Sequence, residues 1–128
     1  MKLLLDTHAF IWWFDEPERL PARVLEALRD PGNELMLSAV SVLEMHLKIE
    51  LGKLDIRPPL EEVVRDHERV NEMTVLPMRA AHVYALRDLP RLHGDPFDRL
   101  LVAQTVVEDA SLVSADEKVA QYPVKVFW

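Results

Sequence analysis

Short apolar runs alternate with amphipathic segments along the whole chain, and this alternation restricts the possible fold more than any other feature. The runs "KLLL" and "ELMLS" are typical of buried strands, whereas "PARVLEALRD" has apolar residues at helical spacing and ends at "PGN". We predict strands over residues 2–5, 34–38, 73–77 and 124–128, a strand together with its exit over 111–116, and helices over 21–30, 39–54, 60–72, 78–90 and 98–110. Such an order favours a parallel sheet covered on both faces. The sequence therefore predicts a three-layer α/β/α domain with a central parallel sheet of about five strands.

The composition fits one domain, residues 1–128, with an ordinary hydrophobic fraction of 49%. The absence of cysteine excludes disulfides, thiolate zinc sites and a cysteine nucleophile. Only three glycines are present, and no Gly-rich phosphate-binding motif occurs. The stretch "AFIWWF" is too short to span a bilayer and no secretory signal is visible, so we expect a soluble cytoplasmic protein with no membrane partner.

The net charge of −7 argues against a general nucleic-acid binder, because such proteins normally carry a basic excess. An acidic protein can still act on nucleic acid when its acids gather around a metal ion. The ion then supplies the local positive charge that the overall composition lacks.

Four acids fall where a parallel sheet would bring them to one edge. Asp6 ends the first predicted strand and Asp116 follows the fourth, while Glu44 and Asp98 lie near the starts of two predicted helices. Ligands bind outside the carboxyl ends of parallel strands, and clustered carboxylates repel one another unless a cation neutralises them. Oxygen ligands without cysteine favour Mg²⁺ or Mn²⁺. We therefore predict that these four acids form a metal-binding and catalytic site.

Each of these acids also has a structural interpretation. Asp6 could cap a helix that begins at Thr7, and Asp116 could belong to a turn. Glu44 could lie at the edge of an apolar helix face. The inference rests on the joint placement of the acids at strand exits and not on any one of them.

The stretch "LHGDPFDRLL" poses the same question for two aspartates. Asp95 can cap a helix that has Pro96 in its first position, and Asp98 stands where a capping-box acid would. Arg99 could contact a phosphate group or form an exposed ion pair. We predict that Asp95 caps the helix while Asp98 points into the acidic site.

Other polar residues near the predicted edge carry less information. Ser38 and Ser114 stand at strand exits, where serines most often bond to local backbone. His8 could reach the site, although a surface position is the simpler interpretation. The remaining histidines have no metal-ligand spacing among them: His46, His67, His82 and His93.

Four separated blocks of the sequence resemble PIN-domain proteins, and most of all the VapC-type toxins of toxin–antitoxin pairs. The blocks are "LLLDTHAFIWW", "LSAVSVLEMHLKIELGKL", "HGDPFDRLLVAQT" and "LVSAD". The resemblance covers essentially the whole chain. It implies a five-stranded parallel sheet between helices and metal-dependent cleavage of RNA. It also implies a cognate antitoxin and a homodimer.

The resemblance places the functional acids of the family on Asp6, Glu44, Asp98 and Asp116. Asp95 is a weaker candidate, and Thr7 lies beside the first of these acids. Bound Mg²⁺ or Mn²⁺ would activate a water, and Glu44 is the first candidate for its base. An exposed apolar surface on "FIWWF" and "VSVLEMHLKIEL" would offer a groove for an amphipathic antitoxin segment.

Two other classes of protein fit parts of the same pattern. A phosphotransfer enzyme of the haloacid-dehalogenase type also ends its first strand with an aspartate, but it needs a second one where this chain has His8. A non-enzymatic metal-binding or phospho-accepting signalling module usually has paired acids early in the chain and does not need Glu44. The RNA that is cut and the number of metal ions stay open.

Overall fold

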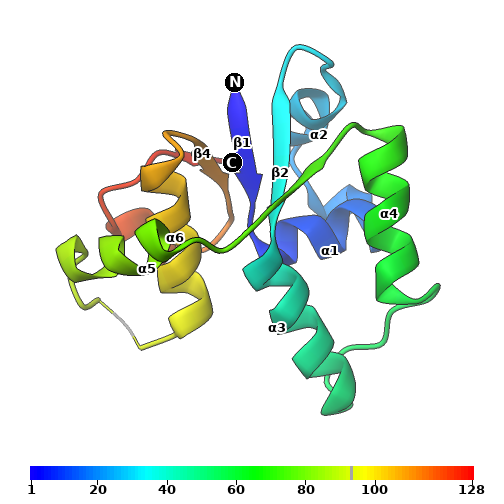
Figure 1. Cartoon of the computed structure of the whole chain (residues 1–128). Helices are drawn as coiled ribbons and strands as arrows, with labels where there is room; N and C mark the ends of the chain where they lie inside the picture. Colours follow the sequence, from blue (N-terminus) through cyan, green and yellow to red (C-terminus); the bar gives the residue numbers. More distant parts are fainter. Residues whose placement is uncertain (93) are drawn as a thin grey trace.

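Figure 1 shows a computed structural model of the chain, which describes residues 1–92 and 94–128. His93, which received no ligand role from the sequence, lies outside the described residues. Within them, five strands form one sheet in the order β3-β2-β1-β4-β5, and every neighbouring pair is parallel. The strands are β1 (Lys2–Leu5), β2 (Glu34–Ser38), β3 (Thr74–Leu76), β4 (Ser111–Val113) and β5 (Val126–Phe127). The predicted parallel sheet is confirmed.

The helices connect these strands. They are α1 (Thr7–Asp15), α2 (Ala22–Arg29), α3 (Ala39–Glu50), α4 (Leu60–Val70), α5 (Ala80–Ala85) and α6 (Pro96–Val107), with 3₁₀ turns η1 (Pro17–Arg19), η2 (Leu86–Asp88) and η3 (Val119–Gln121). Across the described ranges, none of the helices combines the length and the apolar character needed to cross a bilayer.

Side chains of the central strand divide between two hydrophobic cores, because successive residues of a strand face opposite sides. Leu3 and Leu5 belong to one core, together with residues of α1, α2 and α4 such as Phe10. Leu4 belongs to the other core, together with Leu101 and other residues of α6. Figure 1 shows α1, α2 and α4 on one side of the strands and α5 and α6 on the other. The three-layer α/β/α architecture is confirmed.

The helix predicted over residues 78–90 is shorter than expected. Regular helix covers only Ala80–Ala85 and continues as the 3₁₀ turn Leu86–Asp88. Leu89 is extended, with φ −89° and ψ 139°, because the residue before a proline disfavours helical backbone and Pro90 follows it. The other end is limited by Arg79, which is also extended.

The stop signal that the sequence placed at Gly52 is confirmed. Gly52 has φ +71°, a conformation that glycine adopts without a steric penalty. Its backbone N–H donates to the Ile49 carbonyl at 3.1 Å. The helix α3 nevertheless ends at Glu50, earlier than the predicted residue 54.

A buried polar network joins β2, α5 and α6. The Ser38 hydroxyl donates to Oε1 of Gln104. Nδ1 of the fully buried His82 accepts from the Arg79 backbone N–H at 3.0 Å, so Nε2 carries the ring proton and donates to Glu108 at 2.9 Å. This hydrogen bond is the main reason that the pKa of Glu108 lies below its usual value. The network ties the short helix α5 to the core.

We predict that His82→Ala lowers the free energy of unfolding by roughly 2–4 kcal/mol, because it opens a cavity and leaves buried hydrogen-bonding groups unsatisfied. Urea denaturation followed by circular dichroism measures this change. Val83→Ala, one residue further on and 45% exposed, is the control and should change stability by less than about 0.5 kcal/mol. Equal effects of the two substitutions would contradict a stabilising role for the network.

Candidate active site

Asp6 lies directly after β1, at the carboxyl end of the central strand. It is the N-cap of α1, and its Oδ1 accepts from the Ala9 backbone N–H at 2.7 Å. The side chain is nearly inaccessible to solvent. Burial raises the pKa of Asp6, while hydrogen bonds from Ser114 and Ala9 and the charge of His8 act in the opposite direction. Asp6 therefore caps a helix and also faces the site.

Glu44 lies on the second turn of α3, the helix that follows β2, and is only 6% exposed. The Thr7 hydroxyl donates to Oε1 of Glu44 at 2.6 Å and lies 3.0 Å from the hydroxyl of Ser41. The Lys48 ammonium group donates to Oε2 at 2.9 Å. These contacts fix a buried carboxylate beside Asp6 and Thr7, so Glu44 does not lie on a solvated helix face.

Asp116 lies in the loop after β4, where its backbone N–H donates to the Ser114 hydroxyl at 3.0 Å. Its Oδ1 accepts from the Lys118 backbone N–H at 2.9 Å, which confirms the predicted turn. Asp116 and Asp6 together line a cavity of about 310 Å³ that His8 and Trp12 also border. The carboxyl ends of β1 and β4 therefore bring two of the four predicted acids to one cavity.

Asp98 lies in the first turn of α6, and its pKa depends on the charges of the other three acids. Its pKa is raised to about 7, first by burial and then by the negative charges of Asp95, Asp116, Glu44 and Asp6. Charges affect a pKa in this way only at short range, because water and salt screen distant ones. Asp98 therefore lies within electrostatic range of the other three predicted acids.

Asp95 caps α6, as the sequence predicted. Its Oδ1 accepts from the backbone N–H groups of Phe97 at 2.9 Å and Asp98 at 3.2 Å. Its side chain is exposed, in contrast to that of Asp98. Asp95 thus lies at the margin of the acidic cluster and stabilises the helix that carries Asp98.

Three further predicted residues have local roles. The Ser38 hydroxyl caps α3 by accepting from the Val40 backbone N–H at 3.0 Å. Ser114 bonds to Asp6 and to the backbone of Asp116. The Nη2 of Arg99 donates to the Leu86 carbonyl at 3.4 Å, and no described carboxylate forms an ion pair with Arg99. An ion-pair role for Arg99 is therefore not observed.

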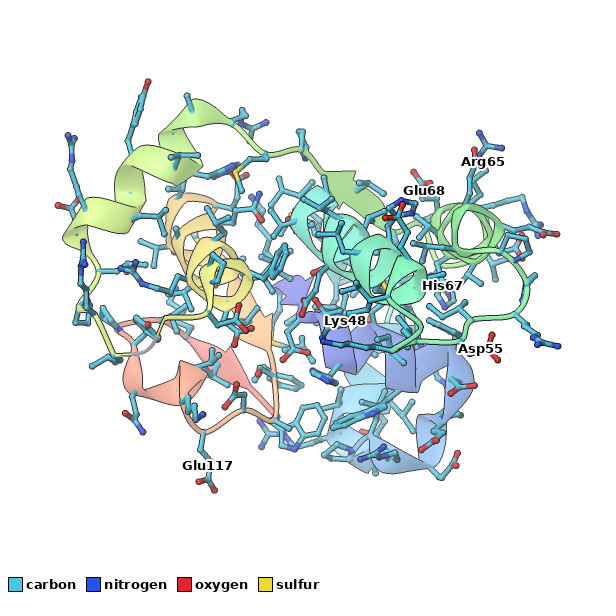
Figure 2. The ribbon with its side chains drawn as sticks, turned by 90° about the horizontal axis from the view of Figure 1, so that it is seen from below. Lys48, Asp55, Arg65, His67, Glu68 and Glu117 are labelled. Carbon is cyan, nitrogen blue, oxygen red and sulfur yellow. The ribbon has the colours of Figure 1, made fainter. Side chains whose placement is uncertain are left out.

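Lys48 is the residue of this site that the sequence analysis missed. Figure 2 views the molecule from the carboxyl ends of the strands and shows Lys48 extending from α3 toward the middle. The side chain is 37% exposed and pairs with Glu44, four residues earlier. That spacing places two residues on one helix face and was the available clue. Ser41, three residues before Glu44 and fully buried, follows from the same argument.

The ligand atoms of the site suit a hard divalent cation. Carboxylate oxygens without sulfur favour Mg²⁺ or Mn²⁺, and a cation would offset the repulsion that raises the pKa of Asp98. No three His, Cys, Asp or Glu side chains of residues 1–92 and 94–128 form a ready-made metal site. The acids therefore fit such an ion in charge and ligand type, although their side chains are not already arranged around one.

The fold agrees with comparisons to known proteins. Residues 3–125 match the model of the PIN domain, and the chain belongs to this family. Among curated proteins, it is 30% identical over 121 residues to Ribonuclease VapC22 of Mycobacterium tuberculosis, which covers 94% of this chain and 91% of that protein.

Solved structures support the same fold. The structure of VapBC2 from Rickettsia felis, bound to a DNA fragment from their promoter, superposes with a TM-score of 0.74 and 16% identity over 98% of this chain and 96% of that one. VapBC-1 from nontypeable Haemophilus influenzae gives a TM-score of 0.62 and 19% identity, over 94% and 91% of the two chains. At these identities the likeness concerns the fold alone.

We predict that removing the charge of Asp98 stabilises the metal-free protein most at high pH. The folded pKa of about 7 exceeds the ordinary value of 3.8, so the folded state binds more protons than the unfolded state between these values. Stability is therefore lost as pH rises through this window, and the loss is complete above it. In EDTA, the melting temperature of Asp98→Asn should equal that of wild type at about pH 4 and exceed it by several degrees at about pH 8.

Glu117→Gln is the matched control for that experiment. Glu117 is exposed, next to Asp116, and its charge is not among those acting on Asp98. Its melting curve should follow wild type across the pH range. A constant difference between Asp98→Asn and wild type at every pH would show that Asp98 does not titrate abnormally.

Proposed function

We propose that this protein is a metal-dependent endoribonuclease that cleaves RNA phosphodiester bonds and acts as the toxin of a toxin–antitoxin pair. The observation that carries the proposal is the convergence of Asp6, Glu44, Asp98 and Asp116, expressed in the raised pKa of Asp98. Membership of the PIN-domain family and the identity to Ribonuclease VapC22 support the choice of RNA. A signalling module would not need the buried Glu44 and finds no comparable support.

The four acids would hold one or two Mg²⁺ or Mn²⁺ ions. When bound, such an ion supplies an activated water and stabilises the charge that develops on the phosphate. Thr7 orients Glu44 through its hydrogen bond to Oε1, and Lys48 keeps a positive charge beside Oε2. Each oxygen of Glu44 accepts one of these hydrogen bonds and keeps a second lone pair, so Glu44 would help to hold the ion and stays the first candidate for the base.

The decisive test compares Asp98→Asn with Asp95→Asn. The first substitution keeps the shape but removes a charge that holds the ion, so RNA cleavage should fall by orders of magnitude while the fold persists. The second should change cleavage little, because asparagine caps a helix about as well as aspartate. Cleavage of a labelled single-stranded RNA pool with Mn²⁺, with Mg²⁺ and with EDTA measures both rates.

Melting experiments provide an independent measurement for the same variants. Millimolar Mn²⁺ should raise the melting temperature of wild type relative to EDTA, and this gain should shrink in Asp98→Asn. Full cleavage by Asp98→Asn, or a wild-type midpoint that Mn²⁺ leaves unchanged, would refute the proposed carboxylate metal site.

We further propose that an amphipathic segment of the antitoxin binds between α3 and α4. A groove of about 540 Å³ lies there, lined mostly by apolar side chains that include Val42, Leu43 and Val64. Leu43 and the neighbouring Leu47 are 50% and 38% exposed. The solved neighbours VapBC2 and VapBC-1, whose names pair two components, support a protein partner. A homodimer, as the resemblance implies, is part of the same proposal.

The stretch "FIWWF" makes a smaller apolar surface than the sequence suggested. Phe10 is fully buried, and Ile11, Trp12, Trp13 and Phe14 are partly buried against the core of α1, α2 and α4. The run winds as a helix, so its side chains spread around the axis and most of them face the protein. The prediction of an exposed surface holds for α3 and is wrong for Phe10.

We predict that Leu43→Asp weakens binding of the small protein encoded beside this gene by about tenfold or more, since a charge in an apolar groove is poorly solvated. The matched control is Val107→Asp, because Val107 is 41% exposed and lies on α6, outside this groove. Calorimetric titration of the purified pair measures both affinities. Unchanged affinity in Leu43→Asp, or equal losses in the two variants, would exclude the α3–α4 groove.

A further inference from the structure

A second cavity, of about 570 Å³, lies between α5, η2 and the start of α6. Its lining includes three arginines, one tyrosine and two leucines: Arg87, Arg91, Arg99, Tyr84, Leu86 and Leu89. Among the described residues, no acid contributes to this lining. We call this cavity the arginine pocket.

The arginines of this pocket lack the carboxylate partners that most other arginines of the protein have. Arg87 and Arg91 are exposed and form no ion pair within residues 1–92 and 94–128. The Nε of Arg99 is buried and has no hydrogen-bond partner in the described part of the chain. By contrast, five other arginines pair with an acid: Arg19, Arg57, Arg65, Arg69 and Arg79.

One hollow thus contains three arginines, and no described acid of its lining neutralises them. This is unexpected in a protein of net charge −7. An anion that entered this hollow would therefore meet three guanidinium groups. Arginine guanidinium groups bind phosphate oxygens through two parallel hydrogen bonds, which makes phosphate the favoured ligand.

The other side chains of the pocket define what the phosphate is attached to. Tyr84 is 63% exposed and offers a ring face, while Leu86 and Leu89 add apolar surface beside it. A base stacks on such a ring while the neighbouring phosphates pair with arginines, which is the usual arrangement for single-stranded nucleic acid. An acidic peptide would use the charges but not the ring.

The pocket adjoins the acidic site through α6. Arg99 directly follows Asp98 in the first turn of this helix and lines the arginine pocket, while Asp98 feels the negative charges of Asp116, Glu44 and Asp6. Successive residues of a helix advance by about 1.5 Å along its axis, so Asp98 and Arg99 start from almost the same point. A single-stranded RNA bound at the acidic site would therefore reach Arg99 within one or two nucleotides.

We propose that the arginine pocket is a substrate subsite that binds a nucleotide of single-stranded RNA next to the bond to be cut. Arg87, Arg91 and Arg99 bind its phosphates and Tyr84 stacks on its base. The proposal rests on the ribonuclease function proposed above. It adds a second place, apart from the acidic site, where the enzyme binds its substrate.

The test measures RNA binding in EDTA, where cleavage is prevented. Fluorescence anisotropy of a labelled single-stranded RNA is recorded with wild type and with Arg87→Gln/Arg91→Gln at salt concentrations from about 50 to 200 mM. The double substitution should weaken binding about tenfold and reduce the slope of log Kd against log salt by about 0.7 for each phosphate that the variant no longer neutralises. Tyr84→Ala should weaken binding about fivefold without a change of slope.

The matched control is Arg29→Gln/Arg69→Gln. These two arginines line another hollow, beside the start of β2, and the substitutions change the net charge by the same amount. Melting temperatures verify that all variants fold. Equal losses in the two double variants, or a slope unchanged in Arg87→Gln/Arg91→Gln, would overturn the arginine pocket as a subsite.

A separate measurement distinguishes this proposal from the proposed function. Wild type is incubated with the same RNA and Mn²⁺, and cleavage products are counted. Cleavage together with unaltered binding by the pocket variants would refute the subsite and leave the ribonuclease standing. Pocket-dependent binding without any cleavage would refute the ribonuclease and leave an RNA-binding surface.

Discussion

The repulsion between acids held near one another by the fold is the constraint on which the rest of this structure depends: Asp6 and Asp116 follow β1 and β4, Glu44 lies on α3 and Asp98 lies in the first turn of α6. Their repulsion is strong enough to help raise the pKa of Asp98 to about 7. A flexible chain would separate these charges, so they stay together only because the surrounding structure holds each one. The parallel sheet supplies that rigidity, since β1 is hydrogen-bonded to both β2 and β4 and its leucines are completely buried.

Local hydrogen bonds offset part of the repulsion, and they explain why the structural and functional interpretations of these acids do not exclude each other. Asp6 and Asp95 each cap a helix, and Asp116 closes a turn. Helix N-termini carry a partial positive charge, so α1 and α6 stabilise acids placed at their starts. The same backbone N–H groups that satisfy helix ends thus help to keep negative charge at the site.

The sequence predicted the ends of β1 and β4 well, because a short stretch of neighbouring residues is enough to recognise each of them. An apolar run followed by an acid fixes the position of Asp6 whatever the rest of the chain does, and the same holds for Asp116. Lys48 and His82 were not assigned roles, because their partners Glu44 and Glu108 are recognised only from helix faces and from contacts between distant helices. The end of α5 was misjudged because apolar spacing continues past the point where Pro90 stops the helix.

Under the two proposals, the net charge says little about how this protein would bind RNA, because acidic and basic side chains line separate cavities. Asp6 and Asp116 line a cavity at the edge of the sheet, while Arg87, Arg91 and Arg99 line a separate one. In our proposal one helix therefore carries both kinds of contact. Asp98 would help to hold the cation, and Arg99 would bind phosphates that the other charges of an acidic protein repel.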